Sequence, residues 1–102
     1  KLKEDDLLLQ EAGCFGLVLE KIPAKLATEV AKNVTIPVIG IGAGSGVDGQ
    51  VLVLHDLLGV TKEFSPRFLR RYLNLYEEMK GAVGQYIKDV KSKDFPNEKE
   101  QY

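Results

Sequence analysis

The sequence has little of the chemistry that marks a disulfide framework or a histidine-rich metal site. Among 102 residues there is one cysteine, one histidine and no tryptophan. A single cysteine, Cys14, cannot form an intrachain disulfide, which is typical of proteins in a reducing cytoplasm. The lone His55 has no second imidazole with which to share a metal. We therefore expect the adjacent His55 and Asp56 to make structural hydrogen bonds, and Cys14 to be a small buried apolar residue.

Neither charge nor hydrophobicity is concentrated in one part of the chain. Fourteen Lys and Arg residues are balanced by fifteen Asp and Glu, which leaves a formal net charge of −1. This balance excludes the basic surface with which proteins bind nucleic acid or an anionic membrane. The longest fully apolar run, Val51–Leu54, is far below the roughly 20 residues that span a bilayer. The first residues also lack the apolar core of a secretory signal. We expect a cytoplasmic protein that binds neither nucleic acid nor membranes.

The first segment is predicted to be a helix that ends at a glycine. Residues 4–12, EDDLLLQEA, place Leu7 and Leu8 on an apolar stripe, and Gly13 stands where helices commonly end. No capping residue precedes Lys1. Two interpretations stay open: a short N-terminal helix, or a chain that is a piece of a longer protein.

Two short apolar runs with a helix between them follow. The run from Cys14 to Glu20 is continuously apolar, which predicts a strand buried on both faces, as in parallel sheets. Pro23 is predicted to occupy the first turn of a helix that reaches Asn33. A second buried strand is expected at Ile36–Ile41. The apolar stripe of the intervening helix comprises Leu26, Ala27, Val30 and Ala31.

A third apolar run, Gln50–His55, could be a strand or the start of a helix that reaches Leu58. We favour the strand, although the connection at residues 42–50 is short for a parallel crossover. Alternating helices and strands predict an α/β fold with right-handed crossovers. Because three strands make too small a parallel sheet, we expect them to be the end of a larger α/β sheet or barrel.

The last predicted element is a long helix. Ser65 is a good capping residue and Pro66 suits the first turn, so the helix is expected to begin there. Apolar residues then recur with helical spacing as far as Val90, which predicts about 25 helical residues despite two glycines. Residues 92–102 form a polar tail that is expected to be irregular.

Glu20 is the candidate catalytic residue, because it ends a buried strand. In (β/α)8 barrels the carboxyl ends of the strands face the active site. Desolvation by residues 17–19 would raise the pKa of the carboxyl group toward that of a working base. The alternative is a solvated carboxylate at a junction between strand and loop.

The glycine-rich turn after the second strand matches a dinucleotide-binding fingerprint, Gly44-x-Gly46-x-x-Gly49. No helix of ordinary length is predicted to follow, and no second strand ends in an acid about 20 residues further on. We therefore discard a Rossmann interpretation. The turn either lets the backbone approach a small ligand closely or simply makes a tight connection.

Three strings carry a family resemblance: EAGCFGLVLEKIP, TIPVIGIGAG and DGQVLVLHDLLG, followed by a long helix and DFP. In this order and spacing the sequence resembles ketopantoate hydroxymethyltransferases along essentially its whole length. The resemblance implies a (β/α)8 TIM barrel, with residues 1–102 as the C-terminal portion of a single barrel domain. The segments would be strands six, seven and eight with the long C-terminal helix, and residues 92–102 the tail.

The resemblance also implies an activity. The family transfers a hydroxymethyl group from 5,10-methylenetetrahydrofolate to the keto acid 3-methyl-2-oxobutanoate, giving ketopantoate in pantothenate and coenzyme A biosynthesis. Its general base maps onto Glu20. Its Mg²⁺, which holds the keto acid and stabilises the enolate, has ligands in the N-terminal half, so no metal ligand is assigned here.

The family forms homo-decamers in which the final helix packs on a neighbouring subunit, so Pro66–Lys91 is expected to be an interface element. The tail at Asn97–Tyr102 departs from the usual ending of the family, and no role is assigned to it. A second class of function stays open, a non-catalytic fragment or a subunit-interaction module of such a barrel.

Overall fold

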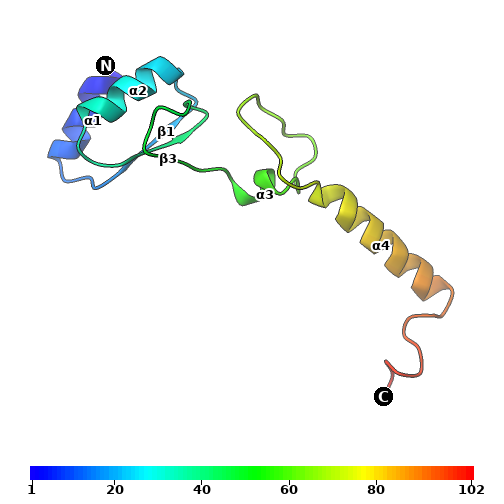
Figure 1. Ribbon diagram of the computed structural model, residues 1–102. Helices are drawn as coiled ribbons and strands as arrows, with labels where there is room; N and C mark the ends of the chain where they lie inside the picture. Colours follow the sequence, from blue (N-terminus) through cyan, green and yellow to red (C-terminus); the bar gives the residue numbers. More distant parts are fainter. The chain divides into compact units, whose positions relative to one another are not determined.

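The computed structural model describes all 102 residues and divides them into two compact units (Figure 1). The sheet unit comprises Lys1–Val53 together with Pro66–Arg70, and the helical unit comprises Leu54–Ser65 together with Arg71–Tyr102. None of the helices combines the length and the apolar character that crossing a membrane requires.

The sheet unit contains a small parallel sheet with strand order β1-β2-β3. Leu17 of β1 pairs with Val38 of β2, and Ile39 of β2 pairs with Gly49 of β3. The predicted α/β class with parallel strands is therefore confirmed. Its elements are α1 (Leu2–Glu11), β1 (Leu17–Glu20), α2 (Ala24–Asn33), β2 (Val38–Ile41) and β3 (Gly49–Gln50).

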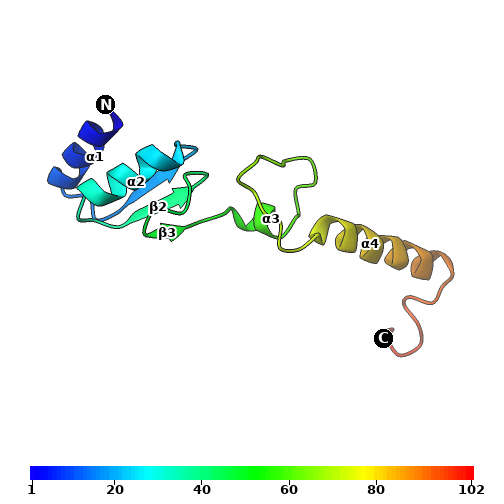
Figure 2. The same cartoon turned by 45° about the horizontal axis from the view of Figure 1, so that its top comes forward.

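The core lies between α2 and one face of the sheet, which α2 crosses in Figure 2. Ala27 and Val30, from the predicted apolar stripe of α2, are fully buried there. Burying a valine side chain contributes about 1.5–3 kcal/mol, so this stripe holds the helix on the sheet. Pro23 precedes the helix instead of occupying its first turn, because its ψ of 132° leaves the backbone extended. The buried core residues are Leu17, Leu19, Ala27, Val30, Val34, Val38 and Ala43.

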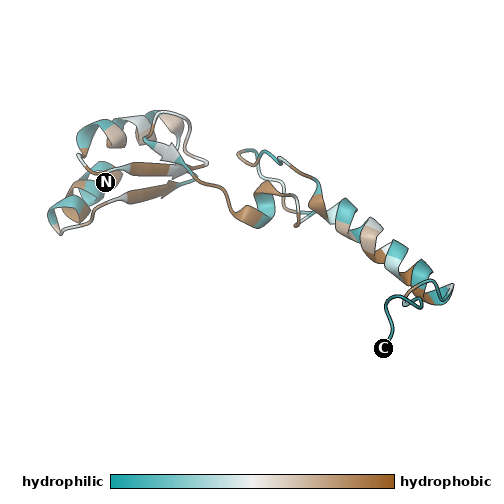
Figure 3. Cartoon of the chain, turned by 60° about the horizontal axis from the view of Figure 1, so that its bottom comes forward, coloured by the Kyte–Doolittle hydropathy of each residue, from teal (hydrophilic) through white to brown (hydrophobic).

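The other face of the sheet is uncovered, so the prediction of strands buried on both faces is wrong for this chain. Leu17 and Leu19 turn toward α2, whereas the Val18 side chain between them is 66% exposed. Ile39 and Ile41 of β2 are only partly buried and share the face of Val18, because parallel partners in register point to the same side. β1 and β2 stand out as apolar in Figure 3. This face is apolar and has no covering layer.

Helix α1 ends as predicted, with Gly13 at φ +104°, but its inward face was predicted wrongly. Leu7 and Leu8 are exposed, whereas Asp6 is 4% exposed. Gln10, one turn beyond Asp6, accepts the backbone N–H of Thr35 at 2.6 Å and thereby ties α1 to the chain before β2. Apolar content alone identified the wrong face, because the inward positions of this helix include polar residues.

The third strand is shorter than predicted. Only Gly49–Gln50 is strand, and His55 lies in the short helix α3 (Leu54–Leu57). The chain leaves the sheet after the Val51 N–H donates to the Gly40 carbonyl at 3.0 Å.

The crossover from β2 to β3 can be short because the loop itself covers the sheet in place of a helix. Ala43 is buried, and Val47 packs against the core. The Asp48 carboxylate accepts the Val38 N–H at 2.7 Å and fixes the loop to the start of β2.

The last helix, α4, spans Leu75–Lys91 and therefore begins nine residues later than predicted. The Arg71 guanidinium instead donates to the carbonyls of Thr61, Lys62 and Phe64, which fixes an irregular loop. The Tyr72 N–H donates to the Leu57 carbonyl at the end of α3. The C-terminal end at Lys91 is confirmed.

Residues 92–102 contain no helix or strand and are exposed, as the polar tail predicts. Tyr86 of α4 contacts Phe95 of the tail with ring centroids 5.7 Å apart.

Candidate functional site

Glu20 lies at the carboxyl end of β1, in register with Ile41 at the end of β2. Its side chain is exposed and belongs to the same face as Val18, away from α2. The expectation that residues 17–19 desolvate it is wrong in part, because Leu17 and Leu19 turn to the opposite face. The strand residues on its own side are the apolar Val18, Ile39 and Ile41.

Lys21 follows Glu20 in a left-handed conformation, with φ +53°. Its N–H donates to the Ile41 carbonyl at 2.9 Å, so the turn is fixed to the neighbouring strand. This conformation costs a non-glycine residue about 1–2 kcal/mol, and such strain concentrates at functional sites. The turn sends the chain toward α2 and leaves Glu20 as the last residue of the strand.

The glycine turn after β2 lies beside this strand end. Gly42 and Gly44 have φ values of +68° and +80°, which glycine adopts without steric cost. Gly44 lies against Ala24, the first residue of α2, and its carbonyl accepts the Gln50 side-chain amide at 2.7 Å. The next element is β3, not a helix, so the dinucleotide-binding fingerprint is not formed and its rejection is confirmed.

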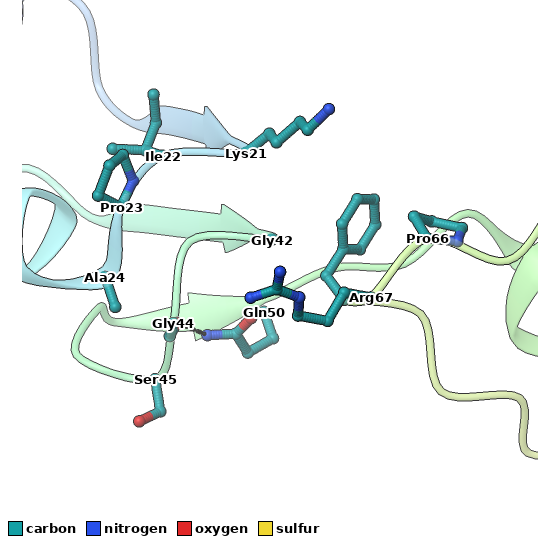
Figure 4. Close-up of a pocket in the computed structure, with 11 residues that line it drawn as sticks. Lys21, Ile22, Pro23, Ala24, Gly42, Gly44, Ser45, Gln50, Pro66 and Arg67 are labelled. Atoms are coloured by element: carbon teal, nitrogen blue, oxygen red, sulfur yellow. Dashed lines mark hydrogen bonds between the residues drawn. The ribbon is translucent and has the colours of Figure 1, made fainter.

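An open cavity of about 880 Å³ lies at the carboxyl ends of the strands (Figure 4). We call it the strand-end cavity. Its charged residues are Lys21 and Arg67, and no Asp or Glu lines it. Figure 4 shows the Lys21 side chain extending beyond the end of β1, and the Arg67 guanidinium turned toward the glycine turn. Its lining residues are Lys21, Ile22, Pro23, Ala24, Gly42, Gly44, Ser45, Gln50, Pro66, Arg67 and Phe68.

Sequence reasoning did not find the cationic residues of this cavity. The position of Lys21, next to a candidate catalytic acid at a strand end, was a usable signal. Arg67 gave none, because it stands in a segment that was predicted to be helix.

The other sequence candidates do not join the site. His55 is exposed on α3, and neither it nor Asp56 makes the expected side-chain hydrogen bond. Cys14 is half-buried, not buried as expected. No three His, Cys, Asp or Glu residues cluster in a way that could hold a metal ion.

Comparison with known proteins identifies the family of the chain. The family model of ketopantoate hydroxymethyltransferase matches residues 1–98. Proteins named 3-methyl-2-oxobutanoate hydroxymethyltransferase from Flavobacterium johnsoniae, Parabacteroides distasonis and Bacteroides fragilis are 71%, 72% and 67% identical over all 102 residues. The chain spans 37–38% of the length of these curated relatives. A match along nearly the whole chain shows that it belongs to the ketopantoate hydroxymethyltransferase family.

Proposed function

We propose that the full-length protein containing this chain transfers a hydroxymethyl group from 5,10-methylenetetrahydrofolate to 3-methyl-2-oxobutanoate, giving ketopantoate for pantothenate synthesis in the cytoplasm. The observation that carries the proposal is the position of Glu20. It is a carboxylate at the carboxyl end of a parallel strand, on the open face of the sheet, in a chain about 70% identical to proteins named for this reaction.

We propose that the sheet unit is a sector of a (β/α)8 barrel that supplies strands six to eight, with residues 1–102 as the C-terminal portion of the barrel domain. In such a barrel one face of every strand packs on the helices and the other fills the interior with branched side chains. The sheet has this asymmetry. One face is covered by α2, and the other presents Val18, Ile39 and Ile41 without a cover. The rest of the full-length protein would complete the barrel and bury that face.

Within this site Glu20 acts as the general base. The methine carbon beside the keto group of 3-methyl-2-oxobutanoate must lose its proton before it can attack the one-carbon unit of the folate. A Glu20 carboxylate oxygen takes that proton, and the electron pair of the broken C–H bond passes into the enolate. Barrel closure would bring the apolar interior, including Val18 and Ile41, around the carboxylate. A positioned base of this kind contributes about 10²–10⁴-fold to the rate.

Magnesium does not fit the residues of this chain alone. Mg²⁺ takes oxygen ligands in near-octahedral geometry, and no three acidic or imidazole side chains cluster here. Glu20 is the only acid that ends a strand of the sheet. We therefore assign the magnesium ligands to the rest of the full-length protein.

The activity is tested with purified full-length protein supplied with the keto acid and 5,10-methylenetetrahydrofolate. Formation of ketopantoate, followed by mass spectrometry, is the expected result, and no product should form when either substrate is omitted. A correctly folded full-length protein that forms no product with both substrates present would refute the proposed reaction.

A subunit-interaction role for α4 is the second candidate function, and one observation favours it. The side chains of Met79, Val83, Tyr86, Ile87 and Val90 lie along one side of the helix and are 41–56% exposed. An apolar stripe of this length on an exposed helix is typical of an interface. We propose that α4 packs on a second copy of the protein in a homo-oligomer, up to the decamer of the family. Introducing a charge with Val83→Asp should lower the native mass in sedimentation, whereas Lys80→Ala should not.

A further inference from the structure

We infer that the strand-end cavity binds the glutamyl tail of the folate co-substrate, with Lys21 and Arg67 receiving its carboxylates. This inference rests on the proposed function and deepens it, because it names the part of the co-substrate held by this chain. The ligand chemistry it specifies is a flat aromatic group followed by one or more carboxylates.

The charges of the cavity select an anion. Lys21 and Arg67 line it without any acidic residue. Neither forms an ion pair or a side-chain hydrogen bond with another residue of the chain. Two cations without counter-charges make the local potential positive. The Arg67 guanidinium can donate two parallel N–H bonds to one carboxylate, and the Lys21 ammonium adds a point charge.

The walls of the cavity fit the aromatic portion of the same ligand. Phe68 lies directly over Gly42, where an added Cβ would come within 2.8 Å of the ring. Glycine at this position therefore allows the ring to seat against the strand end. Ile22 and Pro23 add apolar surface on the α2 side of the cavity. The volume of about 880 Å³ lies in the range of about 300–1,000 Å³ that is typical of small-molecule sites, and it exceeds the need of a five-carbon keto acid.

The position of the cavity relative to the candidate base agrees with a tail site. Lys21 directly follows Glu20, so the two adjoin along the chain. The Glu20 side chain, however, belongs to the open face of the sheet, whereas Ala24 and Gln50 of the cavity belong to the α2 side. A folate whose tail lies in the cavity would thus extend its one-carbon end across the strand ends toward Glu20.

The start of α2 adds to the positive potential of the cavity. Ala24, its first residue, lines the cavity. The first turn of α2 contains no acidic residue, and no side chain caps it. Its free N–H groups therefore carry their partial positive charge uncompensated.

The test uses full-length protein with Arg67→Gln and, separately, Lys21→Asn, since asparagine tolerates the left-handed conformation at that position. Steady-state kinetics should show KM for 5,10-methylenetetrahydrofolate raised about 10- to 100-fold in each variant, as expected for the loss of a charge-assisted contact. KM for the keto acid should change less than about 3-fold. The matched control is Lys25→Gln. Lys25 follows Ala24 in α2 but does not line the cavity, so its substitution removes a nearby positive charge without changing the site.

A binding measurement separates the carboxylates from the aromatic ring. In the unaltered protein p-aminobenzoylglutamate should compete with the folate, and p-aminobenzoate, which lacks the glutamate, should compete at least 10-fold less well. Arg67→Lys should restore part of the affinity lost in Arg67→Gln. Folding of each variant is verified by its melting temperature.

Three results would overturn the inference. The first is an unchanged KM for 5,10-methylenetetrahydrofolate in both folded variants. The second is a rise confined to the KM for the keto acid. The third is equal competition by p-aminobenzoylglutamate and p-aminobenzoate. Failure of the proposed function is separate, because the unaltered protein would then form no ketopantoate at all.

Discussion

Gly44→Ala tests whether the glycine turn packs closely against the first residue of α2. Gly44 has φ +80°, and a Cβ built on it would lie 2.5 Å from the Ala24 Cβ and 3.1 Å from the Ala24 Cα. The substitution therefore introduces two faults, a side chain in a left-handed conformation and an overlap with the first residue of α2.

The size of the effect follows from these two faults. A non-glycine residue in the left-handed region costs about 1–2 kcal/mol. Overlap with a packed neighbour typically costs about 1–3 kcal/mol, and backbone atoms of α2 cannot move aside as a flexible side chain would. Together they predict a loss of about 2–5 kcal/mol in the free energy of unfolding.

The assay is urea denaturation of the full-length protein, with two companion variants. Gly81→Ala in α4 is the matched control, because nothing lies within 4 Å of its added Cβ. Relieving the conformational cost of glycine in a helix should stabilise it by about 0.5–1 kcal/mol. The pair Gly44→Ala with Ala24→Gly should recover the part of the loss that comes from the Ala24 Cβ, and leave the conformational part and the approach to the Ala24 Cα. Stability of Gly44→Ala equal to that of the unaltered protein would refute the close approach of the turn and α2.

Three further predictions concern the core, the buried acid and the open face of the sheet. Val30→Ala, at a fully buried position, should reduce the free energy of unfolding by about 2–3 kcal/mol; a change below 0.5 kcal/mol in the same urea assay would contradict the core. Burial, followed by the charge of Asp5, raises the pKa of Asp6 above its ordinary value of 3.8. Between the ordinary and the raised pKa the native state therefore holds a proton that the unfolded chain has released. The stability that this proton contributes is present below the ordinary pKa and is lost as pH rises through the raised pKa. Asp6→Asn should therefore raise the melting temperature at neutral pH, and a gain that persists unchanged below the ordinary pKa would contradict this linkage. The isolated 102-residue chain, with Val18 exposed and strand edges unpaired, should aggregate or be only partly ordered; a sharp cooperative melt of a monomer in calorimetry would be the opposite result.

Local sequence signals predicted the elements whose residues interact mainly with near neighbours. The apolar stripe of α2 and the runs at β1 and β2 identified the core, and Glu20 was correctly placed at a strand end. Contacts between distant segments were not predictable in this way. Phe68 has the spacing of an α4 residue but packs on Gly42, so the helix was started too early.

The remaining errors have the same origin. Asp6 is buried although an aspartate ordinarily marks the outer face of a helix. Arg67 joins the strand-end cavity only because the chain returns from the helical unit to the sheet unit. No local pattern specifies either contact, since both depend on segments that are far apart in the sequence.

The most direct test of the proposed chemistry is the exchange of the methine proton of 3-methyl-2-oxobutanoate for deuterium, measured by NMR without folate. This omission isolates proton removal from hydroxymethyl transfer. Glu20→Gln keeps the shape of the side chain but removes the basic oxygen. In the full-length protein the variant should bind the keto acid within about 3-fold of the unaltered protein and exchange the proton about 10²–10⁴-fold more slowly. Exchange at the unaltered rate would show that Glu20 is a solvated carboxylate and not the base.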